Sequence, residues 1–343
     1  MQREYGIDIL KIVAMLLVVI NHILFWGGYG VDAPTDDLKG VVLQSLDAIA
    51  ICAVNVFIMA SGWIMCKREV HLRRLVNLWF TVVFWSFAIA VLFQCCGYST
   101  SPRTWIYAFM PVGCNRYWFF TVYVGLFLTM PFLNCCVSNL DPKGRTILAL
   151  GGFILLSVYP SVLRHDLFVT NNGYSLLWFV YLYLFAACAR LNSWDQRVSW
   201  RVGCALIILG GICSVMLPIV LRKASDMIGL KPLVSVFSAY TSPFLFVEAI
   251  GFMIVFTKIK VESISCRKLI TLVVPSVFSV YIIHSNAVFR EAAKWNDFWW
   301  TFLHENDLPV ALVGTVLAGL FIFIICIVMD QLRVLIIRKF HAK

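Results

Sequence analysis

The stretch Asp8-Ile-Leu-Lys-Ile-Val-Ala-Met-Leu-Leu-Val-Val-Ile-Asn-His22 lies inside an apolar run that covers residues 7–27. A bilayer core of about 30 Å needs about 20 apolar helical residues, so this run is long enough to cross a membrane. A second histidine, His284, ends the apolar stretch Val277-Phe-Ser-Val-Tyr-Ile-Ile-His284. An ionisable group in a membrane span costs free energy and rarely faces lipid, so both histidines are candidate site residues. The alternative is that each histidine only hydrogen-bonds a neighbouring helix.

The composition is typical of a polytopic membrane protein. Of the 343 residues, 61% are hydrophobic and 13% are charged, and the mean hydropathy is +0.86. The net charge of +10 does not indicate nucleic-acid binding, because the basic residues cluster in short loops, where they act as topology signals. The sequence has no clear signal-peptide cleavage site and no Cys/His spacing typical of a zinc site. It also has no P-loop, which argues against ATP-driven transport. The sequence leaves open whether two of Cys95, Cys96 and Cys114 form a disulfide.

We predict an all-α bundle of about ten transmembrane helices in a single domain, residues 1–343. The predicted spans are 7–27, 42–65, 75–96, 117–137, 146–163, 174–189, 202–221, 234–257, 269–289 and 309–336. With the N-terminus inside, 17 Lys and Arg residues fall on the inner side and 9 on the outer side. This bias predicts that both termini are cytoplasmic, in a multi-pass protein of a bacterial-type cytoplasmic (inner) membrane.

Helical geometry predicts one depth for the two histidines. His22 follows Asp8 by fourteen residues, which is about 21 Å at about 1.5 Å per residue, and His284 lies about 22 Å along span nine. Both are therefore expected in the outer half of the membrane. Asp8 is too far away to orient His22, and its expected partners are Lys11 or the arginines of the next inner loop.

Other polar groups in the spans are expected to line a shared cavity with the histidines: Asn21, Asn55, Glu248, Ser285 and Asn286. For Glu248 the alternative is a protonated carboxyl that hydrogen-bonds a neighbouring helix.

Two clusters flank the spans. On the inner face, the basic segment from Lys67 to Arg74 anchors the chain to lipid headgroups. Its arginines also suit a phosphate-rich ligand, because a guanidinium donates two parallel hydrogen bonds. On the outer face, Arg116, Tyr117 and Trp118 fit an interfacial aromatic belt and are candidates to hold a sugar or a phosphate.

Five segments together resemble the acyltransferase-3 family of integral membrane O-acyltransferases over nearly the whole chain. In chain order they are Arg3…Asp8-Ile-Leu-Lys11…His22, Asn55-Val-Phe-Ile-Met-Ala-Ser-Gly62, Arg73-Arg74-Leu75, Tyr117-Trp118-Phe119 and Ser279-Val-Tyr281-Ile-Ile-His284. Lys11 stands where arginine is usual in the family, which changes the geometry of any bidentate contact there.

The resemblance implies transfer of an acyl group, usually acetyl, from cytoplasmic acyl-coenzyme A to a hydroxyl of a cell-envelope glycan or its lipid-linked precursor. The chain is similar to the stand-alone forms that have no additional periplasmic domain. Acetyl-coenzyme A or another acyl-coenzyme A would be the co-substrate, with no metal. The expected partners are the glycan or lipid-linked sugar acceptor and membrane lipids, with no nucleic acid.

This hypothesis assigns roles to the candidate residues. Arg73, Arg74, Lys11 and Arg68 would neutralise the coenzyme A phosphates. His22 would act as general base or briefly accept the acyl group, while His284 would orient the acceptor or stabilise the oxyanion with help from Asn55 or Tyr281. The substrate-binding candidates are Arg116, Tyr117, Trp118, Tyr281 and Glu248.

A competing prediction is a proton-coupled secondary transporter or polysaccharide exporter, because intramembrane His and Glu residues suit a proton relay. The sequence shows no inverted repeat and no Gly/Pro-broken helix pair, which argues against it. A structural or sensory membrane protein would leave unexplained why Asp8, Lys11 and His22 share one face of span one.

Overall fold

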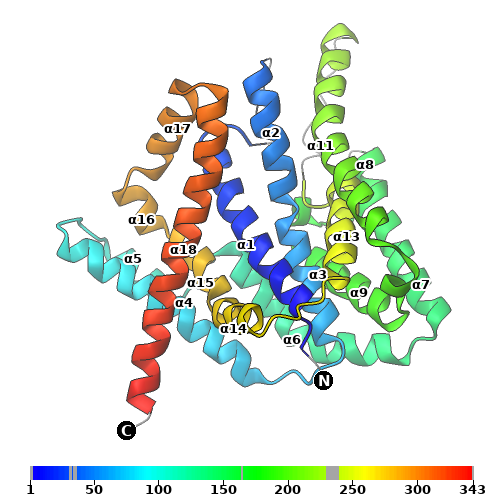
Figure 1. The fold of residues 1–343 in the computed structure, drawn as a ribbon, viewed down its shortest axis with the longest axis horizontal. Helices are drawn as coiled ribbons and strands as arrows, with labels where there is room; N and C mark the ends of the chain where they lie inside the picture. The colour runs from blue at the N-terminus through cyan, green and yellow to red at the C-terminus, as the bar shows by residue number, and fades with distance from the viewer. Residues whose placement is uncertain (1–2, 31–32, 34–36, 164, 229–238, 342–343) are drawn as a thin grey trace.

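The computed structural model describes residues 3–30, 33, 37–163, 165–228 and 239–341 (Figure 1). Over these residues it is a bundle of helices with no strand. Eight helical segments are long and apolar enough to cross a membrane, and two shorter apolar helices, α9 and α13, accompany them. The prediction of an all-α, polytopic membrane bundle is confirmed.

The segments of the bundle follow the chain order. They are α1 (Tyr5–Trp26), α2 with α3 (Leu38–Ile51, Ala53–Met65), α4 (Leu72–Cys95), α6 (Trp118–Asn139), α7 with η1 and α8 (Pro142–Phe153, Ile154–Val158, Tyr159–Leu163), α9 (Leu176–Leu191), α11 (Trp200–Ile228), α13 (Pro243–Thr257), α14 with η3 and α15 (Ile264–Val273, Val274–Ser276, Val277–His284) and α18 (Leu308–His341). Short elements connect them: α5 (Pro102–Phe109), η2 (Asn171–Gly173), α10 (Trp194–Arg197), α16 (Ala287–Ala292) and α17 (Trp295–Glu305).

Helix α1 lies at the centre of the bundle, where it packs against α2, α3, α13, α15 and α18 (Figure 1). Its run of leucine, isoleucine and valine contains no helix breaker until Gly27 and Gly28. Gly28 adopts a φ of +82°, and Tyr29 N–H donates to the Leu24 carbonyl, which closes the helix end. The sequence thereby fixes the outer end of the helix one turn beyond His22.

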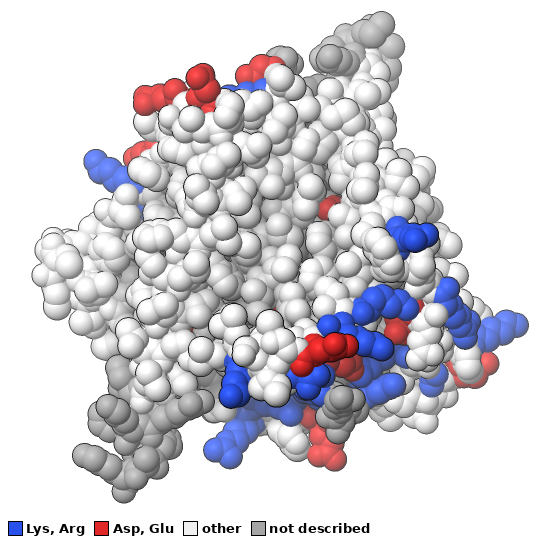
Figure 2. Space-filling view, in the orientation of Figure 1, with Lys and Arg blue, Asp and Glu red and all other residues white. Residues whose placement is uncertain are grey.

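The outward surface of the bundle is apolar. Phe80, Phe132 and Leu317, on α4, α6 and α18, are each more than half exposed, as expected for side chains that face lipid. Figure 2 shows a largely uncharged band, with most of the visible Lys and Arg gathered at the end of the molecule where α1 begins, while Asp and Glu are seen at both ends. This distribution agrees with the predicted cytoplasmic side.

Three of the predicted spans are discontinuous, and in span five the interruption is the π-helical segment η1 (Ile154–Val158) between α7 and α8. Span two turns at Cys52, between α2 and α3, and span nine contains the 3-10 turn η3 around Pro275. Proline lacks the N–H that would continue the α-helical ladder, so the helix changes pitch there. The sequence analysis did not anticipate this Pro-interrupted span.

Span boundaries also differ in two places. Span nine was predicted as 269–289 but ends at His284, because Asn286 caps the next helix by accepting from Val288 N–H and Phe289 N–H. The start of predicted span eight, residues 234–238, lies outside the described residues, and α13 begins at Pro243 after a Ser242 cap. The shortest segments are therefore the sixth and eighth, whereas the fifth and sixth were predicted to be.

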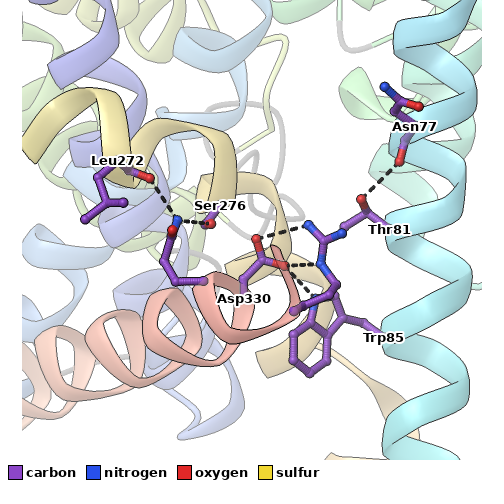
Figure 3. A network of polar contacts seen from close by, with 8 residues as sticks. Asn77, Thr81, Trp85, Leu272, Ser276 and Asp330 are labelled. Atoms are coloured by element: carbon purple, nitrogen blue, oxygen red, sulfur yellow. Dashed lines mark hydrogen bonds and ion pairs between the residues drawn. The ribbon is translucent and has the colours of Figure 1, made fainter. Parts of the chain in front are cut away.

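A buried polar network joins the last helix to α4 and η3 (Figure 3). Asp330 on α18 is fully buried, accepts from the Trp85 indole at 2.8 Å and pairs with Arg333 at 2.7 Å. The neighbouring Gln331 donates to the Leu272 carbonyl and to Ser276, each at 2.8 Å. Since Ser276 immediately precedes α15, the network holds the helix that carries His284.

We expect Asp330→Ala to unfold the protein at a markedly lower temperature. The substitution leaves Arg333 buried without its carboxylate, which typically costs about 3–5 kcal/mol. Thermal unfolding of the detergent-purified protein measures the change, and Glu305→Ala, an exposed carboxylate, is the control. Replacing Asp330 and Arg333 together by leucine should recover part of the loss, and no recovery would contradict the ion-pair explanation.

Candidate active site

The two histidines are in direct contact. His22 Nδ1 on α1 lies 2.8 Å from His284 Nε2 on α15, although 262 residues separate them in the chain. His284 is 1% exposed, whereas His22 is half-buried. The expected common depth is therefore observed, and only His22 is accessible to a substrate.

The hydrogen bonds determine the tautomer of each ring in the neutral pair. His284 Nδ1 lies 2.6 Å from the Val280 carbonyl, which can only accept, so this nitrogen carries the proton. His284 Nε2 is then an acceptor and takes its hydrogen bond from the Nδ1–H of His22. His22 Nε2 is left with a free lone pair, which is the electronic state that a general base or a nucleophile needs.

Aromatic side chains surround the pair. The Trp26 ring lies 4.8 Å from the His22 ring, one helical turn further along α1. Tyr281 lies 6.4 Å from both imidazoles and makes edge contacts with Tyr117 and Phe119 at 5.9 Å. These rings leave the histidines little freedom to turn away from each other.

A cavity of about 370 Å³ extends outward from His22. Trp118, Tyr174 and Tyr240 supply its aromatic wall, and the Trp118 and Tyr240 rings stack at 5.8 Å. Its polar groups include Asp47, which is 1% exposed and accepts a 2.7 Å hydrogen bond from Asn21. Rings beside a carboxylate and an amide form a surface that suits a sugar, because rings stack on its faces and polar groups bond its hydroxyls.

A second, apolar cavity lies on the inner side of His22 and has a volume of about 30 Å³. Its lining includes Met15, Phe57, Phe119 and Tyr281. Since a water occupies about 10–15 Å³ by this kind of measure, the space holds about two waters. The two cavities share five lining residues: Asn21, His22, Ile51, Trp118 and Tyr240. His22 is thus the histidine that both cavities reach.

The helices that line the inner cavity continue toward the basic end of the bundle. One turn from Met15, Phe57 and Phe119 lie Lys11, Ser61 and Tyr123, respectively. Phe119 and Tyr123 stack at 6.1 Å. Lys11 is within electrostatic range of Arg68, and Tyr123 is within range of Arg74. A line of residues on α1, α3 and α6 therefore connects the inner basic segment with His22.

The inner charges differ from the prediction in one pairing. Asp8 bonds Arg3 at 2.5 Å, and Arg3 also donates to Thr271, so neither Lys11 nor an arginine of the next loop is the ion-pair partner of Asp8. Arg73 and Arg74 are exposed at the start of α4, and Arg74 contacts the Met65 sulfur at 3.6 Å. Both arginines are accessible from the inner side.

Two predicted site residues lie away from the histidine pair. Asn55 is fully buried, donates to the Tyr240 carbonyl at 2.8 Å and accepts from the Trp178 indole at 3.0 Å. Both ends of its amide are occupied, so it braces the segment that carries Tyr240 instead of stabilising an oxyanion. Glu248 is fully buried beside Cys52, and Gly210 packs closely against it. Glu248 lines neither cavity.

Of the residues predicted on the outer face, Trp118 and Tyr117 lie close to the histidine pair, whereas Arg116 packs on another ring. Trp118 lines both cavities, and the Tyr117 hydroxyl accepts from Asn286 at 2.8 Å and lies 3.2 Å from the Ser86 hydroxyl. Arg116 sits over the Tyr107 ring at 5.7 Å. Cys95, Cys96 and Cys114 are free thiols.

Sequence reasoning missed Asp47, Tyr240 and Arg290. Asp47 is the only acidic residue in predicted span two, and a carboxylate within an apolar run is the signal that could have found it. Tyr240 and Arg290 were assigned to a predicted span and to an outer loop without a role. No local pattern reveals them, because their proximity to the site depends on tertiary packing.

A family model described as an acyltransferase domain matches residues 4–330. The chain belongs to the acyltransferase-3 family. No curated protein and no solved structure matches it. Family membership makes it a multi-pass membrane acyltransferase, and the histidine pair lies inside the matched region.

Acyltransferase-3 membership also agrees with the arrangement of the resembling segments. The first and the last of them contribute the two histidines, and Tyr117-Trp118-Phe119 supplies rings around both cavities. The segment Arg73-Arg74-Leu75 lies at the basic end. The segments that carry His22, Phe57, Trp118 and Tyr281 are far apart in the chain but contribute to the lining of the inner cavity.

We expect diethyl pyrocarbonate to modify His22 faster than His284. The reagent attacks an unprotonated imidazole nitrogen, and only His22 combines a free lone pair with access to a cavity. Peptide mass spectrometry after a time course measures both sites, with the exposed His71 as a positive control. Equal rates at His22 and His284 would contradict the tautomers assigned above.

Proposed function

We propose that this protein transfers an acetyl group from cytoplasmic acetyl-coenzyme A to a hydroxyl of a cell-envelope glycan or its lipid-linked precursor. The observation that carries the proposal is the position of His22, where an outward cavity and an inward apolar cavity meet. Two substrates that approach from opposite sides of a bacterial-type cytoplasmic membrane would react at this residue.

On the inner side, the basic residues suit the phosphates of coenzyme A. Arg73 and Arg74 are exposed there, and Arg68 and Lys11 continue the positive charge toward the spans. Phosphates favour such donors because charge-assisted hydrogen bonds are about twice as strong as neutral ones. The eleven residues from Lys11 to His22 rise by about 16 Å, which a thin pantetheine arm would bridge along α1.

On the outer side, the 370 Å³ cavity has the size and lining of a ligand site. The Trp118 and Tyr240 rings would stack on a sugar face, and Asp47 would accept from a sugar hydroxyl. Because Asn21 bonds Asp47 and adjoins His22, the bound sugar would present a neighbouring hydroxyl to the catalytic imidazole.

The reaction follows from the tautomers of the neutral pair. His22 Nε2 takes the proton of the acceptor hydroxyl while the hydroxyl oxygen attacks the thioester carbonyl carbon. The C–O bond forms, the C–S bond breaks, and the proton passes from His22 to the departing thiolate. The products are an O-acetyl ester and coenzyme A, with no net proton released.

His284 supports this step without touching the substrate. Its Nε2 accepts from His22 Nδ1–H, so it disperses the positive charge that develops on His22 and fixes the ring orientation. The Tyr281 hydroxyl lines the inner cavity and is the candidate donor to the oxyanion, in place of Asn55.

Acyl transfer should fall by about 10²–10⁴-fold in His22→Ala, because a general base typically contributes that much. His284→Ala should also lose most activity, whereas His284→Gln should retain more, since its amide oxygen accepts from His22 Nδ1–H. Radiolabelled acetyl-coenzyme A and membranes with native glycans provide the assay, read as base-labile label in envelope material at equal protein abundance.

His71→Ala, on the exposed inner loop, is the matched control for histidine removal. Full transfer by well-folded His22→Ala would refute the assignment of the base. No label from acetyl-coenzyme A with the wild-type protein would refute the donor, and the intramembrane histidines would then suit a transporter instead.

The small inner cavity predicts discrimination by acyl length. Phe57 lines that cavity, so Phe57→Ala should raise the use of butyryl- relative to acetyl-coenzyme A by about tenfold, given the cost of extra methylenes in a filled pocket. Competition between the two thioesters measures the ratio. Phe80→Ala, on the lipid-facing side of α4, should leave it unchanged. An unchanged ratio in Phe57→Ala would remove this cavity from the acyl path.

A further inference from the structure

Arg290 is a half-buried arginine beside the histidine pair that no step above uses. Its guanidinium carbon lies 4.9 Å over the Trp26 ring, and the Trp26 ring lies 4.8 Å from His22. Only one ring therefore separates a positive charge from the catalytic imidazole. Arg290 is also within electrostatic range of His284 and Tyr281.

Within the described part of the chain, Arg290 forms no close ion pair, although Glu291 acts on it electrostatically. Its Nε is shielded from solvent and makes no hydrogen bond, and no carboxylate pairs with it. The adjacent Glu291 instead lies 3.5 Å from the Tyr98 hydroxyl. By contrast, Arg3, Arg190 and Arg333 each form an ion pair with a carboxylate. A shielded N–H donor without an acceptor is costly, and a ligand that supplies the acceptor removes that cost.

A second guanidinium lies nearby. Arg116 precedes Tyr117, whose hydroxyl accepts from Asn286, and Asn286 lies one helical turn before Arg290. Burial lowers the pKa of Arg290, Glu291 opposes this shift, and the charge of Arg116 lowers the pKa further. Among the described residues Arg116 has no carboxylate partner either. Because each guanidinium acts electrostatically on the other, an anion that contacts both would relieve their repulsion.

The position indicates which anion. Helix α16 follows the outer end of span nine, so Arg290 lies on the outer side of the histidine pair. Two guanidinium forks match the several oxygens of a phosphate. The Trp26 ring contacts both Arg290 and His22, so an acceptor bound at His22 would bring an attached phosphate close to Arg290.

We infer that Arg290 and Arg116 bind a phosphate group of the acceptor, so that the acceptor is a glycosyl phosphate and not a neutral glycan. This inference rests on the proposed function for the identity of the reaction. The phosphate site itself is defined by the two arginines and is testable without any acyl transfer.

Binding of farnesyl phosphate and of farnesol, which differ only in the phosphate, tests the site on the full-length protein. The protein is purified in a non-ionic detergent that contains neither sugar nor phosphate. Farnesyl phosphate should bind and farnesol should not. Arg290→Gln and Arg116→Gln should each weaken binding by about tenfold or more, the usual effect of losing a hydrogen bond to a charged group. Arg290→Lys should fall in between, because it retains the charge but not the fork.

Lys294→Gln is the matched control, because it removes an exposed outer charge close to Arg290 in the chain. Equal binding of farnesol, or undiminished binding by Arg290→Gln, would overturn the phosphate site. Inorganic phosphate forms a separate arm: Arg290-dependent competition by it alone would support the site and show that a lipid anchor is dispensable.

Acyl transfer separates the two proposals. If Arg290-dependent binding is found but no acetyl group is transferred, the phosphate site stands and the proposed function fails. If acetyl transfer is intact in Arg290→Gln at limiting acceptor, the proposed function stands and the inference that the acceptor binds through a phosphate at Arg290 is overturned.

Discussion

The hydrogen bond between His22 and His284 is the contact on which the arrangement of this protein depends. It joins the central helix α1 to the short helix α15 across 262 residues of chain. Inside an apolar layer, a polar side chain without a partner costs several kcal/mol, so two imidazoles in contact satisfy each other and hold their helices in register. The Val280 carbonyl completes the chain of bonds, and the last acceptor site, His22 Nε2, remains available for chemistry.

The same constraint explains the other buried polar groups. Glu4 and Arg190 form an ion pair that joins the start of α1 to α9, whereas Asp8 with Arg3 and Asp330 with Arg333 pair locally in the chain. Asn55 uses both ends of its amide to hold the Tyr240 segment against α9. Such groups stabilise the arrangement of the helices, but their hydrogen-bonding atoms are already occupied and cannot bind a substrate. His22 and Arg290 each keep a nitrogen that makes no hydrogen bond among the described residues, and both lie on or close to the cavities. Glu248 differs, because its carboxylate oxygens also make no hydrogen bond there but it lines neither cavity.

Hydropathy was sufficient to predict an all-α, polytopic membrane bundle, because a bilayer requires a minimum length of apolar helix. Of the ten predicted spans, eight correspond to described segments of that length, and α9 and α13 are shorter. The helical rise was sufficient to predict the common depth of His22 and His284, since depth is a one-dimensional quantity. Neither hydropathy nor helical rise predicts which residues of different helices contact each other. Asn55 contacts a carbonyl 185 residues away, and Asp8 pairs with an arginine before its helix instead of one in a later loop. The end of span nine was missed because the Asn286 cap competes with a continuing apolar pattern.

The order of synthesis adds a consequence of the histidine contact. Helix α1 is made first, whereas α15 is made only after eight other spans. Until α15 emerges from the ribosome and enters the membrane, His22 lacks the acceptor that sets its tautomer. The histidine pair therefore forms late in biogenesis, and in a nascent or truncated chain that lacks α15 the His22 imidazole has no partner on that helix.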